Sequence, residues 1–152
     1  MSIFGASLRF LDETDRVRRE LDRENERKLF RIGAAIRSQA RRLLRKSNTP
    51  SKPGEPPRTP TTFLRASVFF AVDKASQVVF IGPQLRYGSR ARNSAYPTQG
   101  RTVPQVLEFG GAIRIPVRQG YLLEETIEPR PFMGPALLMA IQSGVIDDIL
   151  SS

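Results

Sequence analysis

The side chains of this sequence that are most able to bind a partner are arginines, and few acids lie near them in the sequence. The chain holds 24 lysines and arginines against 15 acids, which gives a formal charge of +9. Between Arg27 and Arg101 the only acids are Glu55 and Asp73. Such an uneven surplus predicts a negatively charged partner, either a nucleic acid or an acidic protein surface.

One arginine-rich segment is the irregular stretch from Pro83 to Thr102, which has no acid. Its charged and aromatic members are Arg86, Tyr87, Arg90, Arg92, Tyr96 and Arg101. Charge combined with stacking would suit single-stranded nucleic acid. A loop of this length is also typical of a segment that orders on assembly. We favour the second interpretation, because Tyr87 and Tyr96 are too far apart to define a stacking platform by spacing.

A second basic segment closes the first long helix that the sequence predicts. Its members are Arg37, Arg41, Arg42, Arg45 and Lys46. In one interpretation this is a solvated face whose charges complement the helix C-terminus, each by about 0.3–1 kcal/mol. In the other it is a patch for phosphate or for an acidic ring of protein subunits. Charge runs on helices are usually solvated faces, so we favour the first.

The acids form no catalytic arrangement that spacing would bring together. Glu124, Glu125 and Glu128 make one acidic cluster, which could pair with lysines or arginines of an adjacent subunit. The sequence has no histidine and no cysteine, which excludes zinc sites and cysteine or serine–histidine catalysis. It also lacks a phosphate-cradling glycine loop. We predict no enzymatic activity, no metal and no cofactor.

The elements that must position these residues begin with a long helix. Asp12, Glu13 and Asp15 predict its start, and it could run to about Lys46. One apolar stripe has helical spacing: Val17, Leu21, Leu29, Ile32, Ile36, Ala40 and Leu43. The stripe is thin before Leu29, so we expect residues 1–28 to be an exposed or partner-facing arm. Small residues from Gly33 onward would let another helix approach closely.

Prolines end the helix, and short strands follow. Two strands, Arg65 to Val72 and Gln77 to Ile81, should form a hairpin whose first strand is apolar on both faces. A short helix is predicted over Val103 to Phe109, because Pro104 suits a first turn and Gly110 an end. Two more strands, Ala112 to Val117 and Tyr121 to Ile127, should extend the same sheet.

The last helix should run from Pro135 to about Leu150, with Gly144 as a weak point or kink, and should pack on the Leu29 to Leu44 stripe across the sheet. These elements predict a single α+β domain over residues 1–152. Its long N-terminal helix and its C-terminal helix pack on a small antiparallel β-sheet, and residues 83–102 form an extended basic loop. No apolar run approaches the roughly 18 residues of a membrane span, so we expect no membrane contact.

Three patches in the middle and at the end of the chain carry a resemblance. The first is a proline strap and strand entry, with Pro53, Gly54, Glu55, Pro56, Pro57, Thr61, Leu64, Arg65 and Ser67. The second is Leu107, Glu108, Phe109, Gly110 and Gly111, and the third is Arg130, Pro131, Phe132, Met133, Gly134, Pro135, Ala136 and Leu137. In this order they resemble the tail-completion or neck family of tailed bacteriophages, which includes virion-morphogenesis proteins of Mu-like phages. The resemblance covers about residues 32–138.

The resemblance implies a structural virion protein that completes the tail and joins it to the head connector through contacts between rings. It implies a homo-oligomer, taken as a hexameric ring, located at the neck of the virion and in the host cytoplasm during assembly. Its partners would be a tail terminator or tail tube protein and head connector proteins, with passing contact to phage DNA. Thr62 departs from the glycine usual in the family at that turn.

Within that setting, the surfaces expected to contact partners or subunits are Arg86, Tyr87, Arg90, Arg92, Tyr96, Arg101, Arg41, Arg45, Glu124 and Glu125. Phe109 and Phe132 are expected to anchor their turns in the core. The alternative from another class is a free nucleic-acid-binding protein that does not read sequence, which the charge of +9 supports.

Overall fold

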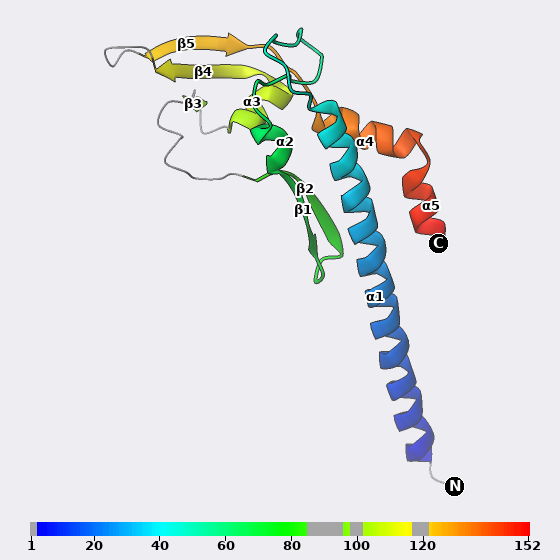
Figure 1. The fold of residues 1–152 in the computed structure, drawn as a ribbon. Coiled ribbons are helices and arrows are strands. Elements are labelled where there is room, and N and C mark those ends of the chain that lie inside the picture. Colours follow the sequence, from blue (N-terminus) through cyan, green and yellow to red (C-terminus); the bar gives the residue numbers. More distant parts are fainter. Residues whose placement is uncertain (1–2, 85–95, 98–101, 117–121) are drawn as a thin grey trace.

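The computed structural model describes residues 3–84, 96–97, 102–116 and 122–152, with side chains for residues 13–84, 102–114 and 123–152. Its elements confirm an α+β fold (Figure 1). A long helix runs beside a hairpin and two C-terminal helices, while a second small sheet lies at the upper end of the molecule.

Helix α1 spans Ile3–Leu43, 41 residues or about 60 Å. It begins before Asp12, so the prediction that acids mark the helix start was wrong, and no acid lies in its first turn. It ends three residues before the predicted Lys46, where the proline strap (residues 44–62) begins. The strap doubles back on itself, because Ser47 N donates to Thr59 O at 3.0 Å and Thr59 N to Arg45 O at 3.3 Å.

Helix α2, Phe63–Ser67, occupies residues that were predicted to begin the first strand. The reason is local, because Leu64, Arg65 and Ala66 favour helix. The β-branched Val68 is where strand β1, Val68–Asp73, begins. Strand β2, Val78–Pro83, pairs with β1 in an antiparallel register that places Ala71 opposite Phe80.

The turn between β1 and β2 is organised by Asp73. Its carboxylate accepts from Ser76 Oγ at 2.8 Å and from the amide of Ala75 at 3.0 Å. These hydrogen bonds, that of the Ser76 side chain first, lower the pKa of Asp73 below its ordinary value. Gln77 takes a positive φ of 53° to close the turn.

One face of this hairpin packs on α1. The ring centroids of Phe30 and Phe70 are 4.9 Å apart in an edge-to-face arrangement. Gly33 lies under the same contact: a Cβ there would be 2.5 Å from Phe70 Cδ2 and 2.9 Å from Val79 Cγ2. At Gly33 itself the close neighbour is therefore a strand pair and not the helix that was predicted to approach there.

Gly33→Ala is expected to destabilise the protein by up to about 2 kcal/mol, although alanine favours helix by about 1 kcal/mol. The added methyl group must displace Phe70 or Val79. Gly82→Ala is the matched control, because no heavy atom lies within 4 Å of a Cβ there. Urea unfolding measures both variants. Stabilisation by Gly33→Ala would contradict the close packing.

A second sheet contains strands β3 (Tyr96–Pro97), β4 (Gly111–Pro116) and β5 (Leu122–Ile127), in the order β3-β4-β5. The prediction that β4 and β5 extend the first hairpin was wrong. The two hairpins face different elements: β1 and β2 contact α1, whereas β4 contacts helix α3. Helix α3, Val103–Phe109, matches the predicted bounds, and Thr102 and Gln105 cap it reciprocally.

The predicted last helix is two helices, α4 (Met133–Gln142) and α5 (Val145–Ser151), bent by 60°. The break is at Gly144, whose φ of 73° is left-handed and favours glycine. Helix α4 packs directly on α1, not across a sheet as predicted. Ala40 of α1 and Ala136 of α4 are both fully buried, and their small side chains allow this close approach.

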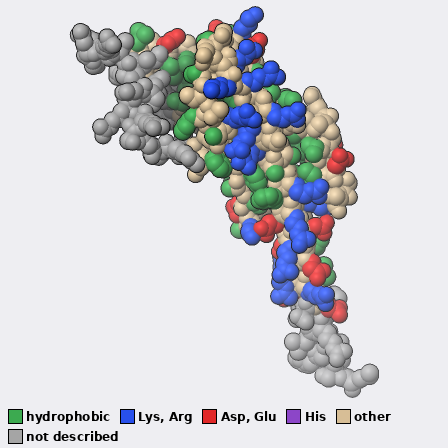
Figure 2. Space-filling view, in the orientation of Figure 1, with side chains coloured by type: hydrophobic (Ala, Val, Ile, Leu, Met, Phe, Trp, Pro, Cys, Tyr) green, Lys and Arg blue, Asp and Glu red, His purple; other side chains and the backbone are tan. Residues whose placement is uncertain are grey.

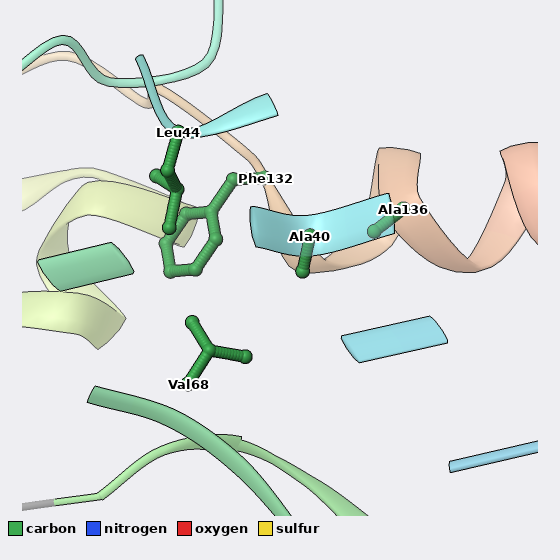
Figure 3. Close-up of a cluster of buried hydrophobic side chains, with 5 residues drawn as sticks. All are labelled: Ala40, Leu44, Val68, Phe132 and Ala136. Atoms are coloured by element: carbon green, nitrogen blue, oxygen red, sulfur yellow. The ribbon is translucent and has the colours of Figure 1, made fainter. Parts of the chain in front are cut away.

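The core lies where α1, β1 and α4 meet. Its buried cluster contains Ala40, Leu44, Val68, Phe132 and Ala136, and Figure 3 shows the Phe132 ring between Leu44 and Val68. Phe132 has no exposed surface, which confirms it as a core anchor. Phe109 is 74% exposed, so the same prediction for it was wrong. Two residues after Leu107, it points to nearly the opposite face of α3.

Candidate assembly surface

The three patches of the resemblance meet at one place, which we call the motif junction. Here the strap is tied to the segment before α4, because Gly54 N donates to Pro129 O at 2.9 Å and Arg130 Nε to Ser51 O at 3.2 Å. Arg130 N also donates to Leu107 O at 2.6 Å. The sequence resemblance therefore corresponds to a single structural unit.

Glu108 is the central member of the motif junction. Its carboxylate accepts the amides of Phe132, Met133 and Gly134 at 2.8, 3.0 and 2.8 Å. These amides belong to the start of α4, whose N-cap residue makes no capping hydrogen bond through its own side chain. A carboxylate at a helix N-terminus also complements the helix dipole. Glu108 is thus a cap for α4.

Two glycines let the backbone at the motif junction come close. Gly110 has a φ of 75°, and a Cβ there would lie 3.0 Å from Pro129 Cδ. A Cβ at Gly134 would lie 3.3 Å from Glu108 Oε1. The residues of this unit are held by one another, which fits a structural role for the motif.

Away from the motif junction, the first part of α1 is a helical arm, which we define as residues 3–25. Figure 1 shows this part of α1 projecting away from the rest of the molecule, and every described side chain from Glu13 to Asn25 is exposed. The body begins at Glu26, which forms an ion pair with Lys74 at the hairpin tip at 2.6 Å, and at Lys28, which donates to Leu150 O at 3.1 Å. Val17 and Leu21 are each 55% exposed on the arm. An isolated helix of this kind is marginal in water, so the arm is suited to a partner.

The outer face of the β1–β2 hairpin is a second exposed apolar surface. Phe69, Ala71, Val78 and Phe80 share this face, because residues two apart on a strand point the same way and Ala71 pairs with Phe80. All four are exposed, and Phe80 has 63% of its surface free. The sequence predicted a first strand that is apolar on both faces. One of these faces packs on α1, and the four residues of the outer face stay exposed within the described chain.

Arginines from two elements gather at the edge of this face. Arg37 and Arg41 of α1 lie over the Phe69 ring, with their guanidinium carbons 5.3 and 5.8 Å from its centroid. Arg37 Nε donates to Val68 O at 3.1 Å, and Arg41 Nη2 to Ala66 O at 3.2 Å. Burial, and then the charges of Arg37 and Arg65, lower the pKa of Arg41. We call Arg37, Arg41 and Arg65 the arginine cluster.

No acid within the described side chains forms an ion pair with the arginine cluster. The Nε of Arg41 is buried without a hydrogen-bond partner. On the face in view in Figure 2, lysines and arginines form a column along the body of the molecule, above an arm on which both charges are mixed. The column is an electropositive surface suited to an anionic partner.

The other predicted contact residues are dispersed. Arg41 belongs to the arginine cluster, whereas Arg45 is exposed beside the strap and lines a shallow hollow of about 190 Å³ with Arg42, Glu55, Pro56, Arg58 and Leu43. Glu124 pairs with Arg114 at 3.7 Å, and Glu125 is exposed on the other face of β5.

The basic loop lies mostly outside the described residues. Arg86, Tyr87, Arg90, Arg92 and Arg101 fall there, so their predicted contacts stay predictions. Tyr96 is described in its backbone alone, which pairs with Arg114 in β3–β4.

In the sequence Arg37 stands only as one member of a charge run, and no motif distinguishes Phe69 or Phe80. The alternation Phe69, Ala71 on one strand and Val78, Phe80 on the other carried the signal. The hairpin register was needed to place the four residues on one face, and tertiary packing was needed to bring arginines to its edge.

The described residues contain no group of three or more acids that could hold a metal ion. A hollow of about 450 Å³ lies between α1 and the end of α5, and its lining has mixed charges: Glu20, Arg23, Glu24, Arg27, Lys28, Arg31 and Ser152. In the described part of the chain, no single helix is long and apolar enough to cross a membrane, and α4 with α5 meets that criterion only as a bent pair.

Comparisons with protein-family models, curated proteins and solved structures gave no match to this chain.

Proposed function

We propose that this protein is a structural component of the neck of a tailed bacteriophage, which completes the tail and joins it to the head connector. It acts by binding, as a ring of identical subunits, and carries out no catalysis. The resemblance in the three sequence patches supports a role in phage assembly. The motif junction adds support, because the residues that carry the resemblance interact with one another in space.

The observation that carries the proposal is the helical arm. A chain that exposes every described side chain from Glu13 to Asn25 on a projecting helix gains little stability from that helix alone. The arm has Val17 and Leu21 on one face for a partner to cover. The exposed outer face of the β1–β2 hairpin is a second such surface. Both surfaces leave apolar side chains in water unless a partner covers them.

The experiment measures the mass of the purified protein by light scattering, alone and with phage tail tubes, in low and high salt. We expect a ring-sized mass and incorporation at the tube end. The paired variant Val17→Ser with Leu21→Ser should stay folded and lose incorporation, because both side chains are half exposed. The control, Arg19→Ser with Arg23→Ser, changes the other face of the same helix and should still incorporate. A monomer that ignores tubes in both salts would refute the proposal.

The column of basic side chains favours a second candidate, a free nucleic-acid-binding protein. That function predicts binding to DNA fragments of any sequence, weakened by about 10³-fold or more between about 50 and 200 mM salt if six or more phosphates are contacted. A salt titration of DNA binding, on the same preparation, separates the two candidates. A steep salt dependence together with absence from tubes would select the second.

A further inference from the structure

The arginine cluster brings like charges together at the edge of an apolar face. Arg37 and Arg41 share the Phe69 ring at 5.3 and 5.8 Å, and Arg65 is near enough to lower the pKa of Arg41. Three cations held together without an acid are stabilised when an anion binds among them. The site therefore calls for a partner that supplies negative charge.

The surroundings of the arginine cluster decide which kind of anion fits. Arginine presents a planar fork that binds carboxylate or phosphate through two hydrogen bonds. The neighbouring outer face of the hairpin is apolar, with Val78 and Phe80 exposed. The guanidinium groups of Arg37 and Arg41 lie over the Phe69 ring, so they occupy part of the surface on which a nucleic-acid base would stack. A protein segment with an apolar side chain beside a carboxylate matches this surface better than a phosphate backbone does.

Strand β5 of this chain has that pattern. Leu123 and Glu125 are two residues apart, so they point to the same face of the strand about 7 Å from each other. Both are exposed, and Glu125 has no ion pair among the described side chains. Glu124 points to the other face, where it meets Arg114. In the described sheet β5 is an edge strand, so it is accessible to another subunit.

We propose that the arginine cluster and the outer face of the hairpin bind strand β5 of a second copy of this chain. Leu123 of that copy covers Phe80, and its Glu125 binds among the guanidinium groups. Donor and acceptor surfaces are different parts of the chain, so the contact is head-to-tail and repeats until a ring closes. The inference rests on the proposed function only in requiring a ring, and it names the surfaces that form it.

The first test reverses the charge of Glu125. Glu125→Arg is expected to weaken self-association by about 10- to 100-fold, measured by sedimentation of the full chain over a range of concentrations. Glu124→Arg is the matched control, with the same change on the same strand but on the opposite face. It should change self-association by less than about 3-fold, because an exposed ion pair contributes little. Equal effects of the two variants would overturn the proposal.

The second test mixes two variants that each fail alone. Arg65→Glu reverses the charge of one residue on the other side of the contact. The Arg65 side chain is exposed, so the protein should still fold. Arg65→Glu and Glu125→Arg should each be poorly associated, whereas an equal mixture should form pairs that contain one subunit of each variant. In such a pair the unchanged arginine cluster of the Glu125→Arg subunit binds the unchanged strand β5 of the Arg65→Glu subunit. Recovery cannot come from misfolded subunits. A mixture that stays dissociated, or a wild-type chain that is monomeric, would overturn the proposal.

If the proposed interface is wrong, the experiments give a different result than if the proposed neck function is wrong. If wild-type protein joins tail tubes but the mixture does not assemble, the neck function stands and this interface is wrong. If Arg65→Glu loses DNA binding without any change in self-association, the arginine cluster serves nucleic acid and the proposal is likewise overturned.

Discussion

Phe132→Ala is expected to lower the free energy of unfolding by about 3–5 kcal/mol. The Phe132 ring has no exposed surface and lies between Leu44 and Val68 in the centre of the buried cluster (Figure 3). Alanine would remove the side chain that joins α1, β1 and α4, leaving a cavity that three elements cannot easily close. Urea unfolding followed by circular dichroism measures the change. Domains of this size are stable by about 5–15 kcal/mol, so the loss is a large share.

Phe109→Ala is the control for that prediction. It is the same substitution at a second phenylalanine of the recognised motifs, but its ring is 74% exposed. Truncating it should change the free energy of unfolding by less than about 1 kcal/mol. Similar losses in the two variants would show that exposure does not separate them, and the assignment of Phe132 as the core anchor would be wrong.

Glu108→Ala is expected to cost about 2–4 kcal/mol of stability. The variant leaves the amides of Phe132, Met133 and Gly134 without their acceptor. Loss of a cap costs about 0.5–2 kcal/mol, and hydrogen bonds to a charged group contribute about 1.5–3 kcal/mol each. These terms are not additive, since the first turn of α4 can relax and water can reach Gly134. The same unfolding measurement applies.

Two comparisons isolate the capping role of Glu108. Glu108→Gln keeps one carbonyl oxygen without the charge, so its loss should fall between those of the wild type and the alanine variant. Glu124→Ala removes a glutamate whose ion pair with Arg114 is exposed, and it should cost less than about 1 kcal/mol. If Glu108→Ala cost no more than Glu124→Ala, the carboxylate would not be the cap of α4.

The Phe132 and Glu108 predictions concern stability, and their variants leave the proposed assembly surfaces intact. Phe132 and Glu108 belong to the interior and to the motif junction, whereas Val17, Phe80 and Glu125 are exposed. Variants of the first group should lose tail incorporation only as far as they unfold. Variants of the second group should lose it while remaining folded, which separates structural from contact residues.

Some of the fold could be predicted from the sequence because its signals are local. Helix α3 was predicted with its full bounds, since Pro104 and Gly110 mark a start and an end within one short segment. The end of α1 was placed within three residues by the prolines that follow. The break between α4 and α5 at Gly144 was anticipated, because glycine alone adopts the left-handed φ there without strain.

Other predictions were wrong where distant contacts decided the outcome. The two hairpins formed separate sheets, where a single sheet was predicted. The residue pattern of a strand shows that it joins a sheet, but it does not show which other strand it pairs with. Phe109 and Phe132 look alike as motif members, and only the orientation of α3 and the entry to α4 separated the exposed ring from the buried one.

The sequence by itself determined the elements of this protein: a long amphipathic helix, a proline strap, hairpins and the absence of histidine and cysteine chemistry. Periodicity, turn residues and composition are properties of short segments, so they can be recognised without a structure. Only the tertiary structure placed Glu108 on the amides of Phe132 to Gly134, and two arginines of α1 over Phe69. These contacts join residues 24 or more positions apart, and no local pattern specifies which distant partners will meet.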